Sequence, residues 1–198
     1  MAKAEQKSER RMGPAGSENW HAMLDGAEEV LREEGHAALT SRRVAERVGV
    51  KQRLIYYYFR TMDDLIVELF HRSSEREIAR LKEAASSDRP MREIWDICIH
   101  TTDARLISEF MALAARIDAL RKEVIHFIEE SRRIQIEAIA KAAKRSKVKA
   151  AIPADGLALI ATSLALSLTR EEQIGIDLGH ETVRDLVETI FDRYEPGD

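Results

Sequence analysis

The sequence lacks the features that mark secreted and membrane-spanning proteins. It holds a single cysteine, Cys98, so no internal disulfide can form, and this usage fits a reducing cytoplasm. The longest uncharged apolar stretch, residues 156–169, is shorter than the roughly 20 residues that a bilayer requires. The first residues form no apolar secretory segment. We therefore expect a cytoplasmic protein that does not cross a membrane.

The motifs of common enzymes are missing as well. The sequence contains neither a P-loop nor a glycine-rich dinucleotide turn, and no motif supplies a catalytic triad of serine, histidine and aspartate. Glu93, Asp96 and His100 fall near one helical face, which is a conceivable site for a divalent metal. No second cluster of histidine or cysteine completes such a site, and a solvated polar face is the preferred interpretation. The sequence thus predicts a protein that is not an enzyme and that holds neither metal nor cofactor.

Helical periodicity is present along nearly the whole chain, and no segment has the pattern of a convincing strand. The 198 residues are 44% hydrophobic and 33% charged, an ordinary composition for a soluble helical protein. Two helix starts are marked by a capping box, Thr61-x-x-Asp64, and by Pro90, which suits a first helical turn. Apolar spacing predicts helices over residues 19–34, 61–85, 90–100, 103–117, 119–146, 154–168 and 181–194, with two shorter helices within residues 40–59.

Residues 40–59 are the most informative segment, because they have the pattern of two short helices joined at one glycine. Val44, Ala45 and Val48 form an apolar stripe that can be buried, and Gly49 stands where a helix ends with positive φ. Positions 50, 54 and 55 are apolar and supply the inward side of the second helix. This is the pattern of a helix-turn-helix, whose second helix enters the major groove of DNA. Five residues remain on its outward side: Lys51, Gln52, Arg53, Tyr56 and Tyr57.

Charge is distributed unevenly along the chain. The whole sequence has 31 basic and 35 acidic residues, a net charge of -4, which argues against a general nucleic-acid coat. Residues 40–60 instead hold six basic side chains and one acidic side chain, so this segment carries +5, the sign that contacts to DNA phosphates need. Residues 63–198 carry -6 and would repel DNA. The two parts of the chain therefore have different partners.

Three short helices that contain a helix-turn-helix, followed by a larger helical body, resemble the tetracycline-repressor (TetR/AcrR-type) family of bacterial transcription regulators. The resemblance is strongest over about residues 24–70, where Gly49-Val50, a short polar run, Tyr56-x-x-Phe59 and a Leu-rich helix follow one another as in the family. It implies an all-α fold with an N-terminal three-helix head and a C-terminal helical bundle for ligand binding and dimerisation. The expected organisation is a mobile tail over residues 1–16, a DNA-binding domain over 17–62, and a ligand-binding and dimerisation domain over 63–198.

The resemblance also implies which residues contact DNA. Thr40, Ser41 and Arg42 open the first motif helix and should touch the phosphate backbone, because free helix N–H groups and a guanidinium both suit an anion. Gln52 and Arg53 lie in the early turn that reaches base edges, where an amide suits adenine and a guanidinium suits guanine. The remaining contacts are expected from Lys51 and from the rings and hydroxyls of Tyr56 and Tyr57.

The chain departs from the family pattern at three positions in or next to these contacts. The family often has a lysine that contacts phosphate where Met62 stands, and it commonly has a small or hydroxyl residue where Leu54 stands and a glycine or proline where Arg53 stands. Met62 cannot contact phosphate. Arg60, Lys51 and Arg53 are the side chains that could replace this contact.

In the family, the helical body encloses a small-molecule cavity and pairs two subunits through its last two helices. Small residues in helix 154–168 and an apolar side of helix 181–194 fit such an interface, with ordinary core as the alternative interpretation. Apolar residues of the three preceding helices are the candidates for the cavity, again with plain core as the alternative. These candidates are Trp95, Cys98, Phe110, Met111, Leu113 and Phe127.

The sequence and its resemblance thus predict a homodimeric repressor that binds a palindromic DNA operator and is released by a small hydrophobic effector. Two other functions remain open. An enzyme with a helical body would need a cavity holding convergent ionisable groups. A ligand-independent architectural DNA protein would bind every sequence alike, with a ratio of specific to non-specific affinity near one.

Overall fold

The computed structural model describes residues 13–101, 103–146 and 152–196, and within these ranges the chain is helical without a strand. It divides into two compact units, Met1–Phe70 and His71–Asp198. This division falls inside a long helix, whereas the sequence placed the boundary at the start of that helix, between residues 62 and 63. Most of the tail expected over residues 1–16 lies outside the described residues. The predicted all-α fold, with an N-terminal helix-turn-helix and a larger helical part, is confirmed.

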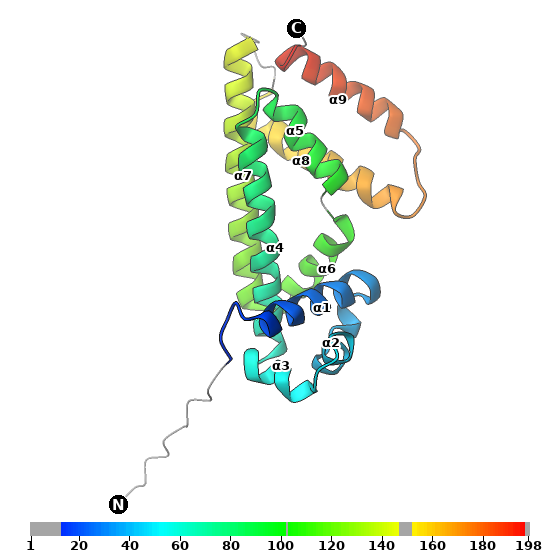
Figure 1. Ribbon diagram of the computed structural model, residues 1–198. Helices are drawn as coiled ribbons and strands as arrows, with labels where there is room; N and C mark the ends of the chain where they lie inside the picture. The colour runs from blue at the N-terminus through cyan, green and yellow to red at the C-terminus, as the bar shows by residue number, and fades with distance from the viewer. Residues whose placement is uncertain (1–12, 102, 147–151, 197–198) are drawn as a thin grey trace, which may run out of the picture. The chain divides into compact units, whose positions relative to one another are not determined.

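Each helix of the described residues corresponds to a helix that the sequence predicts (Figure 1). A 3-10 turn, His36–Ala38, and a π-helical turn, Ile97–Thr101, add to them. None of the helices in this part of the chain is long and apolar enough to span a bilayer. Their bounds are α1 Glu18–Glu34, α2 Ser41–Arg47, α3 Gln52–Tyr58, α4 Met62–Ala85, α5 Pro90–Asp96, α6 Ala104–Ala114, α7 Asp118–Ser146, α8 Ala154–Glu172 and α9 His180–Tyr194.

Two helices begin at the capping residues that the sequence predicts. Thr61 and Asp64 form the predicted capping box before α4: the Asp64 N–H donates to Thr61 Oγ1 at 3.0 Å, and the Thr61 N–H donates to Asp64 Oδ2 at 3.1 Å. Pro90 occupies the first turn of α5, also as predicted. The ends of the helices agree less well with the predicted ends. Helix α8 runs past the predicted residue 168 to Glu172, and α6 stops at Ala114, before the predicted residue 117. Apolar spacing marks a buried face and says less about solvent-facing last turns.

In the first unit, α1 packs its apolar face against the helix-turn-helix. Ser17 caps α1 by accepting a hydrogen bond from the Trp20 N–H at 3.3 Å, and the Trp20 ring stacks on Phe59 with 6.2 Å between centroids. Gly26 lets α2 approach closely, because a β-carbon there would lie 2.3 Å from a methyl group of Val48. The core of this unit includes Met23, Leu24, Ala27, Val30, Leu31, Val44, Ala45, Ile55, Leu65 and Leu69.

In the second unit, the long helix α7 is the element against which α5, α6, α8 and α9 pack (Figure 1). A smaller apolar cluster joins the end of α4 to α5 and α7. The larger cluster joins α5, α7, α8 and α9 through the buried residues Met91, Ile139, Ala142, Leu157, Ala158, Val187, Phe191 and Tyr194. One core is thus shared by α5 and by the three consecutive helices α7, α8 and α9.

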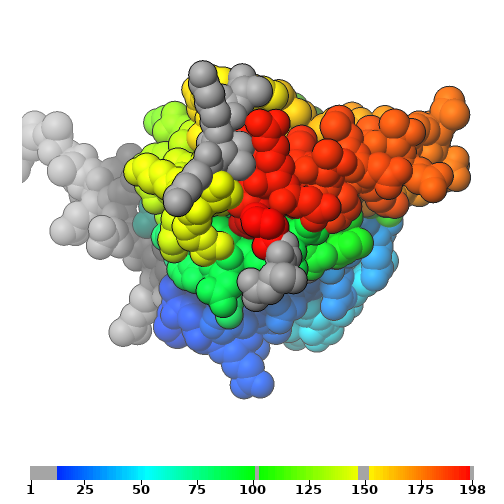
Figure 2. Space-filling model, turned by 90° about the horizontal axis from the view of Figure 1, so that it is seen from above, coloured from blue at the N-terminus to red at the C-terminus, as the bar shows by residue number. Residues whose placement is uncertain are grey.

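The connection from α8 to α9 is the most exposed apolar segment of this unit. Figure 2 shows α9 beside the end of α7, with the α8–α9 connection projecting outward. Ile174, Ile176 and Leu178 in this connection are 75%, 43% and 91% exposed. Apolar side chains gathered on a surface mark an interaction site more often than scattered ones do.

Candidate functional site

The turn between α2 and α3 sets the geometry of the first candidate site. Thr40 caps α2 by accepting a hydrogen bond from the Arg43 N–H at 3.2 Å. Gly49 has φ +71, a conformation that side-chain-bearing residues rarely adopt, and this confirms its predicted place after the end of α2. The Val50 N–H then bonds to the Ala45 carbonyl at 2.9 Å and closes the turn before α3 begins.

Helix α3 is held by one face and presents the other to solvent. Ile55 is 0% and Tyr58 is 7% exposed, so these two side chains anchor the helix in the core of the first unit. The opposite face combines cations, an amide and aromatic rings, which is the chemistry of contacts to DNA backbone and base edges. All five residues that the sequence placed on the outward side are exposed, namely Lys51, Gln52, Arg53, Tyr56 and Tyr57.

Three of the predicted DNA contacts are bonded to one another. Ser41 Oγ lies 3.0 Å from Tyr56 Oη and accepts a hydrogen bond from Gln52 Nε2 at 2.8 Å. Ser41 is only 5% exposed, so its hydroxyl links α2 to α3 instead of facing outward as a phosphate contact would. The link fixes the side chains of Gln52 and Tyr56 on the exposed face. Sequence reasoning did not foresee this link.

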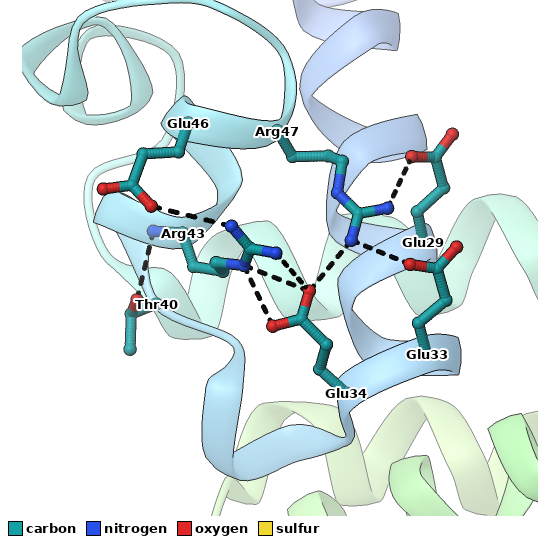
Figure 3. A network of polar contacts seen from close by, with 7 residues as sticks. All are labelled: Glu29, Glu33, Glu34, Thr40, Arg43, Glu46 and Arg47. Carbon is teal, nitrogen blue, oxygen red and sulfur yellow. Dashed lines mark hydrogen bonds and ion pairs between the residues drawn. The ribbon is translucent and has the colours of Figure 1, made fainter.

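Arg43 and Arg47 of α2 point toward α1 (Figure 3). Arg43 donates from Nε and Nη2 to the Glu34 carboxylate at 2.8 to 3.0 Å. Arg47 forms ion pairs with Glu33 and Glu34, each at 2.8 Å, and with Glu29 at 3.3 Å. These contacts fasten α2 to α1 and fix the position of the helix-turn-helix on the first helix.

The ion-pair network between α1 and α2 shifts the pKa values of its side chains. Hydrogen bonding by Arg47 holds the pKa of Glu33 below its usual value, and hydrogen bonding by Arg43 does so for Glu34. The pKa of Arg47 is raised in return, first by its hydrogen bond to Glu33. Because α1 supplies these carboxylates, the net charge of +5 counted over residues 40–60 overstates the positive charge that this surface offers to phosphate.

The cations that remain on the outward side are fewer than the sequence suggested. Arg42 has 80% of its side chain exposed and pairs with Glu46 of the same helix at 2.9 Å. Within the described part of the chain, neither Lys51 nor Arg53 has a carboxylate partner. Met62 is the first residue of α4, and it brings no charge to this surface. Phosphate contacts by side-chain cations would therefore depend on Arg42, Lys51, Arg53 and Arg60, which are all exposed.

The second candidate site is an apolar cavity of about 70 Å³ in the second unit, lined by α5, α7, α8, α9 and the π-helical turn. Two of the residues predicted to bind a ligand, Trp95 and Cys98, line it. The other four are on α6 and α7 and are not part of its lining: Phe110 and Leu113 are buried, Phe127 is half-buried and Met111 is 50% exposed.

The cavity lining is uncharged. Its polar side chains are Cys98, Gln135 and Thr162, and no acidic, basic or histidine side chain is among the residues that line it. Burial raises the pKa of the Cys98 thiol to about 12, so the thiol is neutral and unreactive at physiological pH. Residues such as Leu157 and Val187, which sequence reasoning did not assign to the cavity, come from the helices that it interpreted as a subunit interface.

The acidic and histidine residues that the sequence offered as a conceivable metal site are surface groups. His100 Nε2 lies 3.5 Å from Asp96 Oδ1, with 68% and 66% of their side chains exposed. Across residues 13–101, 103–146 and 152–196, no three histidine, cysteine, aspartate or glutamate side chains gather as a metal site requires. The chemistry of the described residues therefore centres on the α3 surface and the apolar cavity.

Comparison with known proteins bears directly on the first site. Residues 23–69 match the family model described as bacterial regulatory proteins, tetR family. The matched range contains most of α1, the helix-turn-helix and the start of α4. No curated protein matches the chain. The resemblance predicted from the sequence is confirmed.

Three solved structures share the fold of the chain. A TetR transcriptional regulator from Legionella pneumophila is 17% identical, with a TM-score of 0.67 over 88% of this chain and 97% of that chain. A transcriptional regulator from Rhodococcus sp. Rha1 is 16% identical, with a TM-score of 0.67 over 90% and 98%. SmeT in complex with triclosan is 16% identical, with a TM-score of 0.60 over 89% and 85%. At such identities the likeness concerns the fold alone.

Proposed function

We propose that this chain is a DNA-binding regulator of the tetR family of bacterial regulatory proteins and that it acts as a ligand-responsive repressor. The proposal starts from the match of residues 23–69 to that family model. It would bind a palindromic operator as a homodimer in the cytoplasm. The observation that carries this proposal is the exposed face of α3, where Gln52 and Tyr56 are held by Ser41 beside the outward cations Lys51 and Arg53. A surface that is both rigid and rich in hydrogen-bond donors suits sequence-specific contact.

In the proposed complex, α3 lies in the major groove of DNA. Gln52 and Arg53 contact base edges from the first turn of α3, while Arg42, Lys51 and Thr40 contact the phosphate backbone. Two heads related by a two-fold axis would read half-sites whose centres are about 34–36 Å apart. The operator would accordingly be a near-palindrome.

The second unit would supply dimerisation and ligand response. Exposed apolar side chains on α8 and α9 and in their connection, among them Leu159, Leu178 and Leu186, are available to a second subunit. The apolar cavity beside these helices would hold the effector, and the triclosan complex of SmeT, which has the same fold, supports a small molecule as the occupant. Effector binding shifts operator affinity only as far as it favours one conformation over the other.

The proposal is tested by selection of binding sites from a randomised DNA duplex library, using the full chain. We expect enrichment of a single near-palindromic sequence and a mass of the complex that corresponds to two subunits. An enzyme is disfavoured because the cavity lining holds no convergent ionisable groups. An architectural protein would enrich no sequence, and this result would reject the repressor.

A further inference from the structure

We propose that the segment before Gly13 contacts the DNA backbone beside the half-site bound by α3, chiefly through Arg10 and Arg11. The inference rests on the proposed function, and it adds a second DNA-contacting element to the helix-turn-helix. It starts from an observation that the helix-turn-helix does not explain: the chain ahead of α1 is fastened to the end of α3.

The backbone of Gly13 is joined to the C-terminal end of α3. Its N–H donates to the Tyr57 carbonyl oxygen at 2.9 Å. Tyr57 lies in the last turn of α3, where carbonyl groups have no partner within the helix, so this bond uses a group that the helix leaves free. Gly13 is buried, although the two residues that follow it, Pro14 and Ala15, are exposed. The chain is thus held against α3 at one point.

A side chain at this point would collide with two tyrosine rings. A β-carbon on residue 13 would lie 2.5 Å from the Tyr58 ring and 2.7 Å from the Tyr57 ring. These rings meet edge to face, with 5.2 Å between their centroids, and the Gly13 backbone packs on both. On its other side, the Ser17 N–H donates to the Pro14 carbonyl oxygen at 3.3 Å, in a turn that leads into α1. The position of Gly13 is therefore fixed from both sides.

The residues before this anchor carry a positive charge. Residues 1–12 hold four basic and two acidic side chains, a net charge of +2, in a chain whose overall net charge is -4. Arg11 and Arg10 stand two and three positions before Gly13. Because each residue extends the chain by at most about 3.6 Å, their α-carbons are within about 7 Å and about 11 Å of that of Gly13. Both guanidinium groups are therefore tethered near Tyr57, an exposed residue of the proposed DNA-contacting face.

The DNA-facing surface needs cations beyond those of the helix-turn-helix. Arg43 and Arg47 bond to carboxylates of α1, and Met62 brings no charge. Each additional phosphate that a protein neutralises releases condensed counterions and strengthens binding. Two arginines tethered beside α3 supply such contacts, and the DNA backbone takes them at any sequence.

The test measures how the affinity of the full chain for its selected operator depends on salt. In the variant Arg10→Ala with Arg11→Ala, the slope of log affinity against log salt should fall by about 2, since each lost phosphate contact removes about 0.9. Binding at low salt should weaken roughly tenfold, on the operator and on a scrambled duplex alike, as the loss of two exposed ion pairs allows. The variant Arg10→Lys with Arg11→Lys retains the charge and should keep the slope of the parent.

Substitution of the anchor tests the geometry. Gly13→Val places a side chain against the rings of Tyr57 and Tyr58, so it should displace the segment and lower the slope. When it is added to the Arg10→Ala and Arg11→Ala variant, it should lower the slope no further, because all three changes act on the same contact. The matched control is Ala15→Val, at an exposed position of the turn before α1, and it should leave the slope unchanged.

Three results would overturn the inference: an unchanged slope without the two arginines, a loss confined to the operator, which indicates base reading, or an unchanged slope in Gly13→Val. Site selection with the parent protein separates these failures from failure of the proposed function. If the parent selects one operator while the arginine variant keeps its slope, only the inference about the segment is wrong. If the parent selects no sequence, both are rejected.

Discussion

The hydroxyl oxygens of Ser41 and Tyr56 lie 3.0 Å apart and join the start of α2 to the exposed face of α3. Gln52 donates to the same serine oxygen at 2.8 Å, so one buried hydroxyl holds two side chains that are placed to meet DNA. Side chains ordered before association lose less conformational entropy when they bind. The link between Ser41 and Tyr56 therefore predicts an effect on DNA affinity for a residue that itself faces inward.

Ser41→Ala should weaken operator binding by about 1 kcal/mol, or roughly fivefold, because the hydroxyl that holds both Tyr56 and Gln52 is lost. Fluorescence anisotropy of a labelled operator measures this change. Tyr56→Phe removes the other hydroxyl and provides a double-mutant cycle. If the two residues act through their mutual contact, the double variant loses less than the sum of the single losses. Fully additive losses would show that Ser41 does not act through Tyr56.

Substitutions of Arg53 and Arg42 should affect DNA binding in different ways: the first should change sequence preference, and the second should change affinity for every sequence. Arg53→Ala removes a group placed to read base edges, so it should cost about 1–3 kcal/mol on the best operator and relax preference at one base position. Arg42→Ala removes a group placed to contact phosphate, so it should weaken binding to all sequences alike and reduce the slope of the salt dependence by about 1. Titration of specific and scrambled duplexes at several salt concentrations measures both. Equal losses on every sequence from both variants would contradict this division.

The helices and their starts could be predicted because their signals are local. Gly49 ends α2 through its own backbone conformation, and Thr61 and Asp64 form their capping box within one turn. No such signal exists for Ser41 and Gln52 or for Arg47 and Glu29, which are brought together by the packing of helices. The sequence indicated the charge of Arg47, and the tertiary structure decided which carboxylates neutralise it.

Most of the residues that line the cavity could not be predicted from the sequence either. Periodicity identified apolar faces on the helices of the second unit, but it does not state which face meets which. Phe110 and Leu113 have the same apolar character as Trp95, yet only Trp95 lines the cavity. Gln135 attracted no attention in the sequence, because a glutamine on a long charged helix is usually a solvent-facing residue.

Leu186→Glu should convert the proposed dimer to monomers. Leu186 lies on α9 with 56% of its surface exposed, so a carboxylate there costs little in the folded subunit and much in an apolar interface. Analytical ultracentrifugation measures the change. Met111→Glu is the matched control, since Met111 is 50% exposed but lies on α6. Dimers that persist in Leu186→Glu, or dissociation in both variants, would place the interface elsewhere.

Glu195 should stabilise the second unit although it lies just beyond the end of α9. Its carboxylate accepts hydrogen bonds from the N–H groups of Met91 at 2.7 Å and Arg92 at 3.2 Å, which caps the start of α5. Because Glu195 is 3% exposed, Glu195→Ala leaves two N–H groups of the first turn without this acceptor and should cost about 1–3 kcal/mol. Urea unfolding measures this loss. Glu195→Gln keeps one acceptor and should lose less, whereas equal stability of all three proteins would refute the cap.

The ion-pair network between α1 and α2 should make the stability of the first unit depend on pH in the acidic range. The pKa values of Glu33 and Glu34 are lowered in the folded state, chiefly by Arg47 and Arg43 respectively, from a usual value of 4.5. Groups with lowered pKa contribute fully above the usual value, and the contribution is lost as pH falls through the lowered values, because the unfolded chain takes up protons first. The variant Glu33→Gln with Glu34→Gln should therefore be less stable than the parent at neutral pH. Below a pH of about 4.5 the two stabilities should converge.

The measurement uses the fluorescence of Trp20, which stacks on Phe59 in the first unit, in a Trp95→Phe background so that this signal reports on that unit. Thermal unfolding is followed at a series of pH values between about 3 and 7, where glutamates titrate. A second network, in which His180 lowers the pKa of Glu171, lies in the second unit and is unchanged in both proteins. A constant difference in stability between parent and variant over the whole range would mean that the ionisation of Glu33 and Glu34 does not stabilise the head.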